Sequence, residues 1–207
     1  MKNFLCSQGL MLILSSPSGA GKSSITRALI QENSNARLSI SATTRPQRPG
    51  EVNGVDYHFF TQEKFDQLVA QNSFIEHATV FGNQYGTLVS EVDHYLKQGI
   101  DVIFDVDWQG AQNLRKKKTT NLVSIYILPP SISELKNRLA GRRQDSAEVI
   151  EGRMREAMRE ISHYNEYDYV IVNDNFADAL LTVQGIIRAE SSKISRLDSL
   201  DNFIRSF

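Results

Sequence analysis

The chain is expected to fold as an α/β protein in which helices flank a central parallel sheet. Two observations carry this prediction. Short apolar runs alternate with longer amphipathic segments, an order typical of the strand–helix–strand units that build a parallel sheet. A glycine-bearing turn, residues 15–24, joins the first apolar run to the first amphipathic segment. Strand, glycine-bearing turn and helix together form the context of a phosphate-binding loop.

The composition favours a globular protein and excludes several other classes. Of the 207 residues, 41% are hydrophobic, which is enough for a packed core. The net charge of −1 argues against a nucleic-acid binder, so an anion site must come from local placement of basic residues. The single cysteine, Cys6, excludes an intramolecular disulfide and a cysteine-based zinc site. The N-terminal apolar run is too short for a membrane span, so we expect no membrane partner and a cytoplasmic location.

The first core strand, 10–14, leads directly into the phosphate loop. Gly19 and Gly21 allow backbone N–H groups to turn toward an anion, and the helix predicted over 22–33 adds its positive N-terminal end. Lys22 can reach β- and γ-phosphate oxygens, and the Ser23 hydroxyl can bind magnesium. Ser16 stands where this motif usually has glycine, and a positive φ there would strain the loop by about 1 kcal/mol or more.

The chain leaves the alternating order after a short strand over 37–40. Residues 41–50 contain two prolines and a glycine and are expected to form a loop. Arg45 and Arg48 in this loop are a candidate anion fork, because guanidinium groups bind phosphate through paired hydrogen bonds. Solvated loop charge is the alternative interpretation. A strand over 56–60 and a helix over 61–70 follow.

The next segment predicts a strand over 74–81, a turn over 82–87 and a helix over 88–98 that ends at Gly99. Glu76 lies inside the apolar strand. A carboxylate is costly to bury without a partner, and exposure of Glu76 to water is an equally good alternative.

A second core strand over 100–105 ends in Asp105. A carboxylate at such a strand end can hold magnesium beside a phosphate loop, directly or through water, although aspartate also forms turns there. A helix over 108–118 and a third core strand over 122–128 follow. Ser131 and Glu134 then form a capping box that opens another helix.

The segment 138–166 is rich in arginine and is a candidate mobile lid, although each arginine alone is equally compatible with a surface ion pair. The fourth core strand, 169–172, precedes a helix over 175–192 and a polar tail. The four histidines have no metal-ligand spacing, and we assign them no chemistry.

Several sequence blocks resemble the guanylate kinase family in the same order along the chain. They are S-G-A-G-K-S, S-A-T-T-R-P-Q-R-P-G-E-V-N-G-V-D-Y-H-F, F-I-E-H-A, G-N-Q-Y-G-T and F-D-V-D-W-Q-G, and they place the resemblance over roughly residues 9–190. The resemblance implies a P-loop kinase that converts ATP and GMP to ADP and GDP. It implies a core (1–40, 96–137 and 167–207), an inserted GMP-binding subdomain (41–95) and a helical lid (138–166).

The resemblance also implies the residues of the site. Five basic residues are expected to act in catalysis: Lys22, Arg45, Arg138, Arg142 and Arg153. ATP is expected on the loop and beside one asparagine: Pro17, Ser18, Gly19, Ala20, Gly21, Lys22, Ser23, Ser24 and Asn173. The GMP phosphate is expected near Ser41, Arg45, Arg48, Tyr57 and Tyr85, and the guanine near Glu76, Thr87 and Asp107. Magnesium is expected on Ser23 and, through water, on Asp105.

Two alternatives are weighed against this interpretation. One is a scaffold domain of the same family that has lost catalysis, which is disfavoured by the intact phosphate loop and lid arginines. The other is a P-loop kinase for a different acceptor, which Glu76 and Thr87 disfavour. The expected partners are thus two small molecules, ATP and GMP, with no nucleic acid. The sequence leaves the oligomeric state open, and a homo-oligomer is one of the alternatives.

Overall fold

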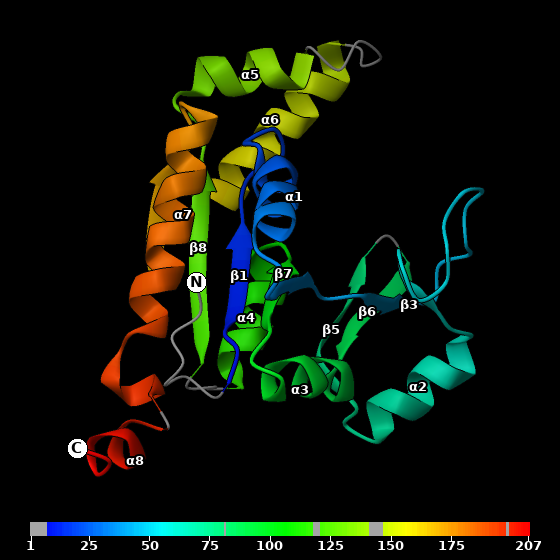
Figure 1. Ribbon diagram of the computed structural model, residues 1–207. Coiled ribbons are helices and arrows are strands. Elements are labelled where there is room, and N and C mark those ends of the chain that lie inside the picture. Colours follow the sequence, from blue (N-terminus) through cyan, green and yellow to red (C-terminus); the bar gives the residue numbers. More distant parts are fainter. Residues whose placement is uncertain (1–7, 81, 118–120, 141–146, 198) are drawn as a thin grey trace.

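A five-stranded parallel sheet forms the centre of the computed structural model, which describes residues 8–80, 82–117, 121–140, 147–197 and 199–207 (Figure 1). The strand order is β2-β7-β1-β8-β9, and every neighbouring pair is parallel. The strands are β1 (Met11–Ser15), β2 (Ala36–Leu38), β7 (Asp101–Asp105), β8 (Leu122–Leu128) and β9 (Tyr169–Val172). The predicted parallel sheet is confirmed.

Helices cover both faces of this sheet, which explains why its strands read as continuous apolar runs. Successive residues of a strand point to opposite faces. Leu12 of β1 packs in a cluster with α1 (Lys22–Glu32) and α7 (Phe176–Ser191). Its neighbour Ile13 packs in the opposite cluster with α3 (Val89–Lys97) and α4 (Trp108–Lys116). All five residues of β1 are buried as a result.

A smaller, mixed sheet lies beside the core, in the order β4-β3-β6-β5 (Figure 1). It consists of β3 (Ser41–Thr43), β4 (His58–Phe59), β5 (Phe74–Val80) and β6 (Asn83–Leu88). Strand β6 is antiparallel to both β3 and β5. Helix α2 (Gln62–Ala70) packs against this sheet, and its Phe65 stacks on Phe74 with 4.4 Å between ring centroids.

Two sequence predictions are wrong in this sheet. Residues 41–50 were expected to form a loop throughout, but Ser41–Thr43 is a strand, and the turn expected over 82–87 is mostly strand β6. Gly86 shows why β6 was missed. A Cβ atom there would lie 3.0 Å from the Glu76 carbonyl oxygen, so glycine serves close strand packing rather than a turn.

Two helices, α5 (Ile132–Ala140) and α6 (Ala147–Ile161), lie near the upper ends of β1 and β8 (Figure 1). They pack through Leu135, Leu139 and Ala157. The predicted capping box is half formed. The Ser131 hydroxyl accepts a hydrogen bond from the Glu134 N–H at 3.1 Å, whereas the Glu134 carboxylate binds Arg138.

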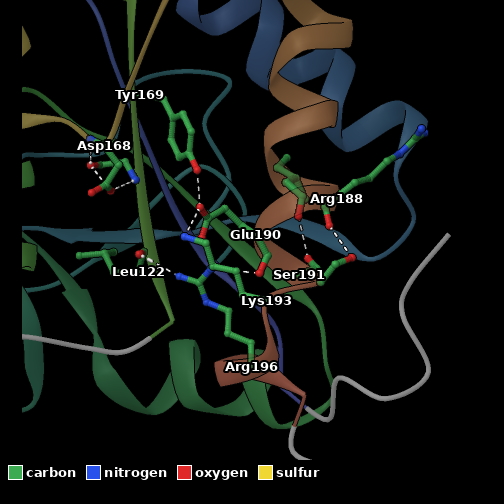
Figure 2. A network of polar contacts seen from close by, with 11 residues as sticks. Leu122, Asp168, Tyr169, Arg188, Glu190, Ser191, Lys193 and Arg196 are labelled. Atoms are coloured by element: carbon green, nitrogen blue, oxygen red, sulfur yellow. Dashed lines mark hydrogen bonds and ion pairs between the residues drawn. The ribbon is translucent and has the colours of Figure 1, made fainter. Parts of the chain in front are cut away.

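The C-terminal residues are more ordered than the polar tail that was expected. After α7, the chain forms η2 (Ile194–Arg196) and α8 (Leu200–Ile204), whereas a further short helix, η1 (Tyr164–Glu166), lies before β9. Buried Glu190 anchors this end (Figure 2), because its carboxylate accepts from Tyr169, Lys193 and Arg196. Burial alone would raise the pKa of Glu190, but these hydrogen bonds hold it at about 2. In the described part of the chain, no helix is long and apolar enough to cross a membrane.

Candidate active site

The phosphate loop leaves β1 at Ser15 and enters α1 at Lys22. Gly19 and Gly21 have φ values of 91° and 96°, a left-handed conformation that glycine adopts without strain. Ser16 is not strained, because Asn72 is the only residue other than glycine with a positive φ in the ranges that the structure describes. The departure from the usual motif at Ser16 therefore has no backbone cost.

Buried Asn173, which follows β9, holds this loop in place through its side chain. Its Nδ2 donates to the Ala20 carbonyl oxygen at 2.7 Å, and its side chain lies against Gly21. A Cβ atom on Gly21 would be only 2.3 Å from that Nδ2, so no larger residue fits. The predicted position of Asn173 beside adenine stays a prediction, while its contact with the loop is a second role that the sequence did not reveal.

Lys22 and Asp105 form an ion pair in the site. The ion pair follows from the register of the sheet. Leu14 of β1 lies opposite Asp105 of β7, and the two parallel strands end at the same side of the sheet. The Ser23 side chain lies next to Lys22 at the start of α1 and is exposed. Basic and acidic groups of the phosphate loop and of β7 are therefore adjacent, as the sequence predicted.

The donor set beside the loop suits magnesium that is bound together with phosphates. Among the described residues, no group of three or more histidine, cysteine, aspartate or glutamate side chains could hold a metal ion. Magnesium commonly binds one or two protein oxygens and takes its other ligands from phosphate and water. The Asp105 carboxylate and the Ser23 hydroxyl are oxygen ligands of this kind, so the residues present fit.

A carboxylate from α6 reaches the same loop. Glu160 Oε2 accepts a hydrogen bond from the Ser18 backbone N–H at 3.1 Å. Burial raises the pKa of Glu160, as do the nearby charges of Glu156 and Asp107, whereas the Ser18 N–H and Lys22 oppose the shift. An internal anion thus occupies one N–H group of a loop that is suited to phosphate. This contact has no signal in the sequence, because Glu160 is one acidic residue in a long helix of mixed charge.

The three predicted lid arginines have different surroundings. Arg138 Nε donates to Glu134 Oε1 at 2.9 Å, and both Nη atoms lie 3.4 Å from the Asn173 carbonyl oxygen. Arg138 is therefore already directed toward the base of the loop. Arg153 lies on α6 and is partly exposed. Arg142 lies outside the described residues.

Three predicted base-binding residues meet where the small sheet faces the core. Thr87 pairs with Ser41 on one side and with Glu76 on the other, and its Oγ1 donates to Glu76 Oε1 at 2.8 Å. Glu76 is only 8% exposed, so it does not face water. Burial raises the pKa of Glu76, and the charge of Asp107 adds to this effect. Asp107 comes from the core, where its Oδ1 caps α4 by accepting from the Gly110 N–H at 2.9 Å.

Arg45 lies in the loop that follows β3, beside the aromatic rings of Tyr57 and Phe59. Its guanidinium carbon is 5.2 Å from the centroid of the Tyr57 ring, and the Tyr57 and Tyr85 rings are 6.0 Å apart. Burial raises the pKa of the Tyr57 hydroxyl, so it stays protonated and able to donate. Arg48 is exposed on the same loop. Glu51, which the sequence reasoning did not single out, accepts hydrogen bonds from Arg45 and from the Arg48 backbone.

The arrangement therefore offers two anion sites with different chemistry. The phosphate loop supplies backbone N–H groups and Lys22, while the small sheet and the loop after β3 supply tyrosine hydroxyls and guanidinium groups. Beside the second site, a buried carboxylate and two other oxygen groups can recognise hydrogen-bond donors on a ring.

Comparison with known proteins agrees with this geometry. The model of the family described as "Guanylate kinase" matches residues 8–190. A guanylate kinase of Rhodopseudomonas palustris is 51% identical over 198 residues, covering 96% of this chain and 90% of that protein. One of Mannheimia succiniciproducens is 56% identical over 187 residues, covering 89% of each.

A solved structure gives the same result. The crystal structure of guanylate kinase from Anaplasma phagocytophilum has a TM-score of 0.76 and 35% identity, and the match covers 98% of this chain and 97% of that one. The family match covers most of the chain, and the curated relatives are matched over nearly their whole length. This chain belongs to the guanylate kinase family.

Proposed function

We propose that this protein is a guanylate kinase that transfers the γ-phosphoryl group of ATP to GMP, forming ADP and GDP for purine nucleotide metabolism. The single observation that carries the proposal is the buried pair of Glu76 and Thr87 in the small sheet, whose strand β3 leads into the loop that bears Arg45. A buried carboxylate suits guanine, and a guanidinium group on the loop after β3 suits a phosphate.

Base selection follows from hydrogen-bond complementarity. An ionised Glu76 accepts from guanine N1–H and from the 2-amino group. Adenine has an acceptor at N1 and no 2-amino group, so it would leave the buried carboxylate without a partner. Sites that hydrogen-bond a substrate group reject an analogue lacking that group by about 10⁴-fold or more. The Thr87 hydroxyl, already bonded to Glu76 Oε1, fixes the orientation of the carboxylate.

Phosphoryl transfer to GMP needs charge neutralisation more than proton removal. A phosphate monoester has its second pKa near about 6, so the attacking oxygen is already ionised at neutral pH. Lys22, Arg45 and Arg48 compensate the charge of the two nucleotides, and Arg138, Arg142 and Arg153 join them from the lid. Lys22 must exchange its ion pair with Asp105 for phosphate oxygens. Ser23 and Asp105 would hold magnesium, which neutralises phosphate charge when bound.

The parts of the chain divide this work. We assign GMP to residues 41–95, the closing lid to 138–166 and ATP to the core, with Asn173 beside the adenine. The assignment of GMP to residues 41–95 is supported by the small sheet, because its four strands, β3 to β6, are consecutive in the sequence and lie within this segment. A cytoplasmic location belongs to the proposal, since a chain with one cysteine has no need of an oxidising compartment.

The test is ADP release with GMP, AMP, CMP and UMP as acceptors. We expect GMP to exceed the others in kcat/KM by about 10⁴-fold. Faster turnover with another nucleotide would refute the guanine assignment. No turnover with any acceptor, despite binding of GMP, would favour a scaffold domain.

A further inference from the structure

Glu51 lies in the loop between β3 and β4, where both of its carboxylate oxygens are in use. Oε1 accepts from Arg45 Nη2 at 2.7 Å, and Oε2 accepts from the Arg48 backbone N–H at 2.8 Å. One carboxylate therefore fixes the side chain of one arginine and the backbone of the other. The two arginines are the anion fork of the proposed GMP site.

The backbone around Glu51 is folded so that its side chain points back into the loop. The Glu51 N–H donates to the Arg48 carbonyl oxygen at 3.1 Å, and Gln47 Nε2 donates to the Glu51 carbonyl oxygen. Gly50, with a φ of 90°, makes this turn. The loop is closed by contacts that converge on one residue.

Arg45 is held in a defined conformation by this arrangement. Its side chain is 11% exposed and that of Glu51 is 20% exposed, so water competes little for their contact. Arg45 Nη1 donates to the Pro46 carbonyl oxygen at 2.8 Å, and the Tyr57 ring lies against the guanidinium. The hydrogen bond to Arg45 lowers the pKa of Glu51, and the Arg48 N–H lowers it further, so the carboxylate is ionised at neutral pH.

Glu51 is unsuited to bind the nucleotide itself, because a carboxylate repels a phosphate dianion. It could still act in either of two opposite ways. It could compete with phosphate for Arg45, or it could hold Arg45 ready for phosphate. The hydrogen bond from the Arg48 N–H favours the second role. Competition with phosphate for the Arg45 guanidinium would not require a second contact that fixes the conformation of the loop. A guanidinium also has five N–H donors, and Glu51 Oε1 accepts from Nη2 alone.

We propose that Glu51 is a positioning residue, which orders the Arg45–Arg48 fork before GMP arrives. This inference rests on the proposed function, since it assumes that the fork binds the phosphate of GMP. Ordering a flexible side chain in advance removes part of the entropy that binding must otherwise overcome.

The test compares GMP with guanosine, which has the same base and no phosphate. We expect Glu51→Ala to raise the Kd of GMP about tenfold and to leave the Kd of guanosine unchanged. Glu51→Gln should have a smaller effect, because the amide oxygen can replace only one of the two contacts. Binding of ATP to these variants should not change.

Asp56→Asn is the matched control. Asp56 belongs to the same loop, and its Oδ2 accepts from the Val52 N–H at 2.7 Å. This variant should leave the Kd of GMP unchanged. The effect of Glu51→Ala on the Kd of GMP should be smaller in an Arg45→Ala background than in the parent protein, because only the part that acts through Arg48 is left, so the two effects should not add fully.

Three results would overturn the inference. They are an unchanged Kd of GMP in Glu51→Ala, a tighter Kd, and an equal loss for guanosine, which would mean general damage to the subdomain. Thermal unfolding identifies a variant that does not fold, and Glu51→Gln, which keeps the shape of the side chain, then supplies the answer. If Arg45→Ala itself leaves GMP binding unchanged, the phosphate site of the proposed function fails rather than the role of Glu51.

Discussion

Replacing Glu76 by glutamine tests the proposed specificity with almost no change in volume. The Thr87 hydroxyl donates to Glu76 Oε1 at 2.8 Å, and in the variant it would select the amide oxygen. The amide NH₂ would then face the base. Guanine presents N–H donors there, so one charge-assisted hydrogen bond is lost and two donors oppose each other.

The size of the effect follows from these contacts. A hydrogen bond to a charged group contributes about 1.5–3 kcal/mol, and an opposed buried donor costs about 1–3 kcal/mol more. The sum, about 2.5–6 kcal/mol, corresponds to a decrease of about 10²–10⁴-fold in kcat/KM for GMP. The value for AMP should rise or stay constant, because the amide can donate to adenine N1.

The assay measures ADP release with GMP and with AMP for Glu76→Gln and for the control Glu63→Gln on the exposed surface of α2. The control should match the parent protein. The pH dependence adds an independent check. Because burial raises the pKa of Glu76, the parent should lose more GMP affinity than the variant as pH falls through this raised value, whereas protonation of the GMP phosphate affects both proteins equally. An unchanged ratio of GMP to AMP activity in the variant would refute the reasoning.

Three further predictions concern the phosphate loop and the C-terminal anchor. Lys22→Ala should lower kcat about 10²–10³-fold at saturating nucleotides, and a smaller change in kcat would remove Lys22 from the reacting centre. Glu160→Gln removes a negative charge beside the Ser18 N–H, so calorimetry should show tighter ATP binding, and weaker binding would mean that Glu160 supports the loop instead. Glu190→Gln should lower the free energy of unfolding in urea by about 3 kcal/mol at neutral pH, because it removes the carboxylate charge that compensates the buried guanidinium of Arg196. Since the pKa of Glu190 is depressed from 4.5 to about 2, the parent should lose this stability as pH falls across that interval, and an identical pH dependence in the variant would contradict the assignment.

The local features of the fold were readable from the sequence. The apolar runs at 10–14, 100–105, 122–128 and 169–172 all correspond to strands of the parallel sheet, because strands buried on both faces have to be apolar throughout. Strand β6 could not be predicted from an apolar run. Its polar residues and Gly86 look like a turn, and only pairing with β3 and β5 makes them a strand.

The same division applies to the candidate site. By itself, the sequence determined the phosphate loop, Asp105 at a strand end and the arginine pair of the loop after β3, because each depends on residue types at short spacing. The tertiary structure alone decided that Glu76 is buried, that Asn173 braces the loop and that Glu160 reaches Ser18. Glu160 lies 142 positions from Ser18 in the sequence, and Asn173 lies 153 positions from Ala20. No local pattern records such contacts, since they depend on how α6 and the last core strand pack around the sheet.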